Sequence, residues 1–190
     1  GDRMKILSKV ASAMILSTGL LMASSYSVDN AHSNVGFTVK HMMVTNVHGK
    51  FTSYDAKVEF DDATKTFKKL VANIDTNSID TGIEKRDNHL RSDDFFAVEK
   101  FPKMTFEMTS YKADGDDGKM TGNLTIRGIT KPVVLEVEDI AMLGDKVGFS
   151  LEGKINRQDF DLKWNKAIEL GGVAVSDEVK IKVDIEAKKQ

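Results

Sequence analysis

The chain has 190 residues, a formal net charge of −2 and no cysteine. This slightly acidic balance argues against a nucleic-acid-binding surface, which would require an excess of clustered Lys and Arg. The lack of cysteine excludes a disulfide scaffold, a thiol nucleophile and a thiolate metal site. At this length we expect one domain that is held together by apolar packing and backbone hydrogen bonds.

The N-terminus has the pattern of a secretory signal peptide. Two lysines precede the mostly apolar run VASAMILSTGLLMA at 10–23, which is shorter than a comfortable transmembrane helix. Ala23 and Ser25 supply the small residues of a cleavage site, so we expect cleavage before Tyr26. A retained amphipathic or membrane anchor is the alternative.

These features divide the chain into two expected parts. Residues 1–25 comprise a short remnant or misread start ahead of Met4, followed by the cleaved signal peptide, and residues 26–190 form the mature domain. Removing three basic and one acidic residue leaves 24 basic and 28 acidic ones, a net charge of −4. We expect a single periplasmic domain without a stable transmembrane anchor.

Apolar and polar residues alternate through most of the mature chain. This period of two is typical of strands with one buried face and one wet face. The alternation covers 35–39, 56–60, 104–108, 133–137, 147–151 and 179–185. Together with the segments FKKLVANIDT and GKMTGNLTIR it predicts about eight strands, which begin near residues 28, 49, 67, 103, 119, 132, 145 and 178.

Turn-forming residues separate several of these strands. They occur in FDDATKT (60–66), ADGDDGK (113–119), RGITKP (127–132) and LGDK (143–146). Such short connections favour antiparallel neighbours. Eight strands are just enough to close a barrel that fills itself or holds one small ligand. The predicted fold class is therefore an all-β, eight-stranded antiparallel barrel, with an open sandwich as the competing architecture.

The stretch DTGIEKRDNHLRSDDFFAVEKFP at 80–102 interrupts the strand pattern. Asp80 or Thr81 could cap a first short helix, and Ser92 could cap a second one. We expect a short helical insertion over about 81–100 that lies across an end or flank of the barrel. Its charges should face outward, and its aromatic side chains should face inward: Phe95, Phe96 and Phe101.

The same insertion holds a dense cluster of acids, bases and imidazole at 84–94, which raises the question of an active site. A His89–Asp93 pair would need one unbroken helix, and the four histidines lack a metal-binding spacing. The loop DGDDG at 114–118 lacks the EF-hand ligands at its fifth and twelfth positions. We predict no catalytic residue, no metal and no cofactor.

Five collinear blocks carry a family resemblance: HSNVGFTVKHMMVTNVHGKF (32–51), IDTGIEKRDNHLRSDDFFAVEKFPKMTF (79–106), GNLTIRGITKPVVLEV (122–137), INRQDFDLKWN (155–165) and SDEVKIKVDIEA (176–187). Together they resemble the YceI family of exported, lipocalin-like polyisoprenoid-binding proteins. The resemblance runs from about Tyr26 to Lys188. At Asp161 the chain departs from it, because the family usually has glycine after the Phe of RxDFGLxW.

The resemblance implies a lipocalin-like barrel with a long apolar channel for an isoprenoid or fatty chain, and no catalysis. A strand of about ten residues is about 33 Å long, which would suit such a chain. The candidate channel residues are Phe37, Val39, Met43, Phe51, Phe106, Met108, Leu124, Ile126, Phe149, Leu151, Phe160, Trp164, Ile181 and Val183. Taken without the resemblance, they are better explained as ordinary core residues that fill a closed barrel.

Two functions follow as hypotheses. The first is a periplasmic carrier that sequesters a long-chain isoprenoid or similar amphiphile, for example the tail of an isoprenoid quinone. The second is a secreted lipid-modifying enzyme that uses the polar cluster at 84–94. A homodimer is a further hypothesis, since lipid carriers often shield an open mouth.

Overall fold

The computed structural model describes residues 23–167 and 174–190. The predicted signal peptide therefore lies almost wholly outside the described residues. The first strand begins at Ser24, two residues before the predicted cleavage point. Within the described part of the chain, no helix combines the length and the hydropathy needed to cross a membrane.

The described residues form mainly strands. These are β1 (Ser24–Val28), β2 (Asn34–His41), β3 (Thr45–Phe51), β4 (Tyr54–Asp61), β5 (Thr66–Asp75), β6 (Ile79–Asp80), β7 (Lys103–Asp114), β8 (Asp117–Ile126), β9 (Ile129–Leu143), β10 (Lys146–Asn156) and β11 (Val175–Lys189). The helical elements are α1 (Glu84–Arg91) and the short 3₁₀ turns η1 (Thr76–Ser78) and η2 (Arg157–Phe160).

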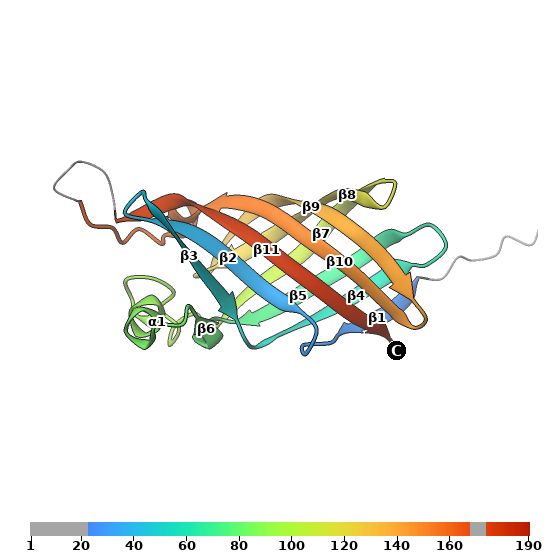
Figure 1. Ribbon diagram of the computed structural model, residues 1–190, viewed down its shortest axis with the longest axis horizontal. Coiled ribbons are helices and arrows are strands. Elements are labelled where there is room, and N and C mark those ends of the chain that lie inside the picture. Colours follow the sequence, from blue (N-terminus) through green and yellow to red (C-terminus); the bar gives the residue numbers. More distant parts are fainter. Residues whose placement is uncertain (1–22, 168–173) are drawn as a thin grey trace, which may run out of the picture.

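Eight of these strands close an antiparallel ring in the order β1-β4-β5-β7-β8-β9-β10-β11, and β11 pairs back to β1. The C-terminal part of β11 contacts β1, and its N-terminal part contacts β2, which in turn pairs with β3. Figure 1 shows an elongated barrel with α1 at one end and the C-terminus at the other. The predicted eight-stranded barrel is confirmed, and the open sandwich is wrong.

The predicted strands near 28 and 49 are each split in two. The first of these strands is interrupted at 29–33, because Asp29 accepts a hydrogen bond from the backbone N–H of Ala31 (2.9 Å) and forms a local turn that competes with strand pairing. The second is interrupted at 52–53, where the hydroxyl of Ser78 accepts from the N–H groups of Thr52 (3.1 Å) and Ser53 (3.0 Å). Side-chain competition for backbone groups thus divides both strands.

Most predicted turns lie where the sequence places them. The connection β8–β9 is shorter than the predicted 127–132: only Arg127 and Gly128 form it, both with positive φ (50° and 73°). A two-residue turn with positive φ at both positions has a twist that matches the twist of the strands on either side. Ile129 to Pro132 therefore continue as strand.

The end of the barrel away from α1 is filled by aromatic rings. Phe67 lies at the centre, with ring centroids 4.9 Å from Phe60, 4.8 Å from Phe149 and 5.1 Å from Tyr111, all in edge-to-face arrangements. Tyr26 extends the cluster through Phe60. Edge-to-face pairs at these separations are favourable beyond the burial of their area. This end is therefore a packed plug.

A buried phenol fixes the seam between β1, β4 and β11. The Tyr26 hydroxyl donates to Oδ1 of Asp62 at 2.8 Å, and Nζ of Lys189 donates to the other oxygen at 2.8 Å. Burial, followed by the hydrogen bond and the charge of Asp62, raises the pKa of Tyr26 to about 12. The folded barrel therefore holds the protonated phenol more firmly than the unfolded chain does.

We expect Tyr26→Phe to lower the free energy of unfolding by about 1.5–3 kcal/mol at neutral pH, the usual value of a hydrogen bond to a charged group. Above about pH 10 the unfolded chain releases the phenolic proton first, so the wild type loses up to about 3 kcal/mol as the pH rises to about 12. The variant has no phenol to titrate, so the difference in free energy of unfolding between the two proteins should disappear as the pH approaches about 12. Urea unfolding across this range measures it.

Both variants are made in the full-length, uncleaved chain, where the matched control is Ser24→Ala. It removes a hydroxyl that donates to the same carboxylate at 3.3 Å but does not titrate. The free energy of unfolding that this control loses should be the same at every pH in the range. A constant gap for Tyr26→Phe as well would contradict the assigned role of the phenol.

Candidate functional site

The barrel holds an apolar cavity of about 200 Å³, whose lining reaches Leu90 of α1 and the rings of Phe95 and Phe96 that follow this helix. Inward-facing side chains of β2, β4, β5 and β7 to β11 form its wall, and no polar surface of the described residues is exposed to it. An apolar cavity of about 150 Å³ is already enough to stay dry and bind a benzene-sized guest. The interior is therefore hollow where the sequence predicts a channel.

Ten of the fourteen candidate channel residues line this cavity: Phe37, Val39, Phe51, Phe106, Leu124, Ile126, Phe149, Leu151, Ile181 and Val183. The inward residues of β2 and β11 are only half-buried, although they face the barrel axis. They line the cavity and also contact the core. Whether a ligand contacts them stays a prediction.

The other four candidates lie elsewhere. Met43 does not face the channel: it is 61% exposed at the tip of the β2–β3 hairpin, because the alternation of β2 ends at His41. Met108 packs against the core beside a bulge in β7, outside the cavity wall. Phe160 is fully buried in η2, and Trp164 lies at the mouth described below.

The sequence reasoning missed several wall residues. Leu70, Ala72 and Ile74 of β5 face the cavity, and their alternation within FKKLVANIDT was an available signal. Ala72 pairs with Ala56 of β4, so two small side chains leave this part of the barrel unfilled. Leu90 of α1 also lines the cavity, and only the packing of the helix on the barrel places it there.

A second cavity of about 430 Å³ lies between β2, α1 and the segment around Trp164. It shares five lining residues with the first: Phe37, Val39, Leu90, Phe95 and Val175. Exposed residues also line it, so we call it the mouth of the channel. Its polar lining consists of Lys40, His41, Thr81, Lys85, Arg86 and His89.

The helix at the mouth is positioned by its own charged residues. Ile83 occupies the N-cap position without a capping side chain, so neither Asp80 nor Thr81 caps α1 as predicted. Instead the Asp87 carboxylate reaches back and accepts hydrogen bonds from the N–H and the hydroxyl of Thr81. Arg86 donates to the hydroxyl and carbonyl oxygens of the same threonine. Asp87 is buried, which corrects the prediction that all these charges face outward.

The predicted second helix does not form. Residues 92–100 make turns, and the hydroxyl of Ser92 donates to the carbonyl of His89 at the C-terminal end of α1. Arg127, from the β8–β9 turn, donates to the carbonyl oxygens of Asp93 and Phe95 and thereby fixes this segment on the barrel. Phe95 and Phe96 point into the cavity as predicted, whereas Phe101 lines neither the cavity nor the core and lies under the guanidinium of Arg127, 5.8 Å from ring centroid to Cζ.

His89 is held between an acid and an aromatic pair. Its Nε2 lies 2.8 Å from Oδ2 of Asp94, and not beside Asp93. Its ring meets those of Trp164 and Phe95 edge to face, with centroids 4.9 Å and 5.1 Å away. His89 therefore closes one side of the mouth.

Arg157 is a buried hub beneath the mouth. Its guanidinium donates to the carbonyl oxygens of Leu162, Trp164, Val175 and Ser176, and to the Asp177 carboxylate. Burial lowers the pKa of Arg157, and the charge of Asp177 opposes this effect. Its ion-pair partner is Asp177 from β11, 3.1 Å away.

The unusual residue Asp161 has left-handed backbone angles, with φ 60° and ψ 22°. Glycine adopts this conformation without strain, and aspartate is among the few other residues that tolerate it. We expect Asp161→Gly to change the free energy of unfolding by less than about 1 kcal/mol, and Asp161→Val to lower it by about 1–2 kcal/mol. Urea unfolding checks this, and equal values for both variants would contradict the backbone explanation.

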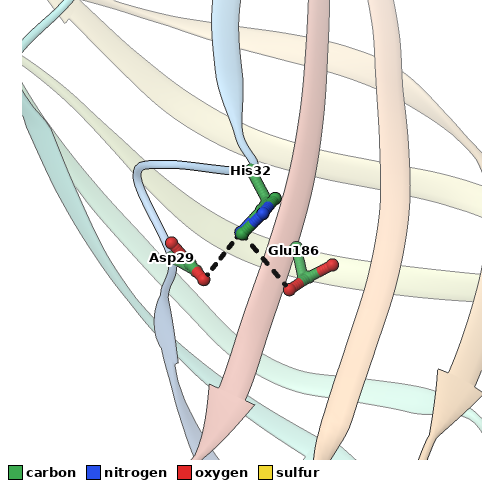
Figure 2. Close-up of side chains that lie close together, drawn as sticks. All are labelled: Asp29, His32 and Glu186. Carbon is green, nitrogen blue, oxygen red and sulfur yellow. Dashed lines mark hydrogen bonds and ion pairs between the residues drawn. The ribbon is translucent and has the colours of Figure 1, made fainter.

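Asp29, His32 and Glu186 bring their side-chain ligand atoms within 4.8 Å of one another. Figure 2 shows His32 between the two carboxylates, 3.0 Å from Asp29 and 3.8 Å from Glu186. Lys146 already donates to Glu186 at 2.6 Å, and the His32 hydrogen bond lowers the pKa of Asp29. The contacts among these residues are best explained as the interactions that hold the β1–β2 loop on β11.

The fold and the cavity define a class: small closed antiparallel barrels with a hollow apolar interior, of the lipocalin-like type. A model of the YceI-like domain matches residues 26–187. Protein YceI of Salmonella newport is 36% identical over an alignment of 192 positions, which covers 97% of each chain. The chain therefore belongs to the YceI family.

Solved structures agree with this assignment. The Campylobacter jejuni YCEI protein shares 44% sequence identity with a TM-score of 0.70, over 86% of this chain and 96% of that one. A polyisoprenoid binding domain from Saccharophagus degradans is 17% identical with a TM-score of 0.63, over 89% and 99% of the two chains. That more distant likeness shows a shared fold.

Proposed function

We propose that this protein binds and carries a long-chain isoprenoid or a similar amphiphile in the barrel. The observation that supports this most directly is the unfilled apolar interior. Inward residues of β2 and β11 are half-buried and line this cavity. The Saccharophagus degradans domain, which has the same fold, is described as polyisoprenoid binding.

Burial alone can supply the affinity. Each CH₂ group removed from water contributes about 0.8 kcal/mol, so ten buried groups contribute about 8 kcal/mol before the ordering costs of binding. The wall needs no polar contact to achieve this. The direction of insertion follows from the asymmetry of the barrel: aromatic rings fill one end, and the mouth lies at the other.

A lipid-modifying enzyme that uses the 84–94 cluster is the weaker proposal. The charged groups that would act there bind the chain itself: Asp87 and Arg86 bind Thr81, and Arg91 donates to the carbonyls of Asn77 and Ile79. These groups are engaged in holding α1 against β6.

We further propose that the carrier works in the periplasm, as the N-terminal pattern predicts.

Mass spectrometry of lipid extracted from the purified protein tests the carrier function. We expect a co-purifying prenyl or fatty chain, and uptake of a fluorescent prenyl probe by the delipidated protein. A barrel that contains no lipid and takes up no prenyl chain would contradict the proposal. Turnover of a lipid that is abolished by His89→Ala would favour the enzyme. Light scattering separately tests the homodimer hypothesis.

A further inference from the structure

The end of the barrel that carries the mouth also carries most of its exposed apolar side chains. Six large apolar residues of the described chain are exposed, and four of them lie here: Met42 (40%), Met43 (61%), Val44 (80%) and Ile83 (53%). Met42 to Val44 form the tip of the β2–β3 hairpin, whose flanking residues line the mouth. Ile83, just before α1, lines the mouth from the opposite side.

The hairpin tip holds its methionines in an unfavourable backbone conformation. Met42 and Met43 have φ values of 52° and 59°. Hairpin turns of this hand strongly prefer Asn-Gly, and a non-glycine residue in the left-handed region costs about 1–2 kcal/mol. The sequence therefore places two long, adaptable apolar side chains in solvent where a polar turn would be more stable.

Positive charge surrounds these apolar residues. Lys40, Lys85 and Arg86 line the mouth, and no Asp or Glu is part of its described lining. Within the described residues, no carboxylate lies within ion-pair distance of Lys40 or Lys85, although Glu84 is the chain neighbour of the latter. The chain as a whole carries a net charge of −2. Three cations therefore lie beside the exposed apolar side chains at this end, although the carboxylate of Asp94 lies 2.8 Å from His89, which also lines the mouth.

We propose that this end of the protein is a docking surface for an anionic lipid bilayer. We call it the mouth rim and define it as Lys40, Met42, Met43, Val44, Ile83 and Lys85. The apolar tip would enter the headgroup layer while the lysines contact anionic headgroups, an attraction of about 1 kcal/mol per cation near such a surface. A chain could then pass between bilayer and channel without crossing water. The inference goes beyond cargo binding, because docking requires no particular cargo.

Single-cysteine labelling of the full chain can test the proposal, because the sequence contains no native cysteine. An environment-sensitive fluorophore is attached at Met43→Cys or, as the matched control, at Leu143→Cys. Leu143 is 83% exposed and is the last residue of β9. Figure 1 shows the turn that follows β9 at the end of the barrel opposite α1. Vesicles of phosphatidylcholine, with or without phosphatidylglycerol, are added to each labelled protein.

We expect the label at position 43 to shift to the blue and to be quenched by lipid-borne quenchers only with the anionic vesicles. The double substitution Lys40→Glu and Lys85→Glu should abolish the shift, whereas Lys57→Glu with Lys112→Glu on exposed strand positions should preserve it. Met43→Asp with Val44→Asp separates docking from cargo binding, because these two tip residues line neither cavity. Co-sedimentation of this variant with the anionic vesicles should be lost, whereas its uptake of a prenyl probe from detergent should survive.

Three outcomes would overturn the proposal. One is the absence of any shift at position 43, and another is an equal or larger shift at position 143, which would place the opposite end on the bilayer. The third is a concentration-dependent shift at position 43 without vesicles, together with a doubled mass in light scattering. That result would assign the mouth rim to a second copy of the chain.

Discussion

Replacing Ala72 by tryptophan is expected to abolish most prenyl uptake while the barrel stays folded. Ala72 lies on β5, pairs with Ala56 and Phe106, and faces the cavity of about 200 Å³. An indole ring at this position would occupy the space that a chain needs. We expect affinity for a fluorescent prenyl probe to fall at least about tenfold, a loss of about 1.4 kcal/mol.

The free energy of unfolding of Ala72→Trp should change little, or should rise while the affinity for the probe falls. Filling a cavity commonly adds about 0.5–2 kcal/mol, whereas overpacking removes about 1–3 kcal/mol. Circular dichroism and thermal unfolding therefore accompany the binding assay. Ala141→Trp is the matched control, because Ala141 is exposed on β9. Normal uptake by a folded Ala72→Trp protein would show that the chain binds elsewhere.

Substitution of Arg157 by methionine is expected to produce the largest loss of stability. The guanidinium satisfies four carbonyl oxygens and one carboxylate, from residues 162–164 and 175–177. Methionine fills similar space but leaves these acceptors without their donor. Removing one partner of a buried charged network typically costs about 3–5 kcal/mol. Urea unfolding should show a loss of this size.

Two further substitutions show why the effect belongs to the hub. Arg157→Lys should recover only part of the loss, since an ammonium group cannot reproduce the planar fork of donors. Lys154→Met removes an exposed partner of Glu178 at 3.4 Å and should cost less than about 1 kcal/mol. A comparably small loss for Arg157→Met would mean that water replaces the guanidinium.

Particular residues show how far local patterns predict this protein. The alternation at 147–151 and 133–137 placed the buried faces of β10 and β9 correctly, because a strand exposes successive side chains on opposite faces. The same rule failed at Met43, where the hairpin tip ends the alternation. Met108 still packs against the core, as the alternation predicts, although it does not line the cavity.

The insertion shows a different limit. Its composition predicted helix, charge outside and phenylalanine inside, and α1 and the inward rings agree. However, Asp87 is buried because Thr81 offers it two donors, and Arg127 reaches the segment from a turn more than thirty residues away. No local pattern encodes such partners.

The sequence by itself determined the fold class and the family, because strand periodicity, turn residues and five collinear blocks are local properties of the chain. Only the tertiary structure decided which end of the barrel is filled and which is hollow. That asymmetry depends on rings from β4, β5, β7 and β10 meeting at Phe67, and on two alanines facing each other across β4 and β5. Closing the barrel brings these side chains together from distant parts of the chain, and the resulting packing leaves the cavity beside α1.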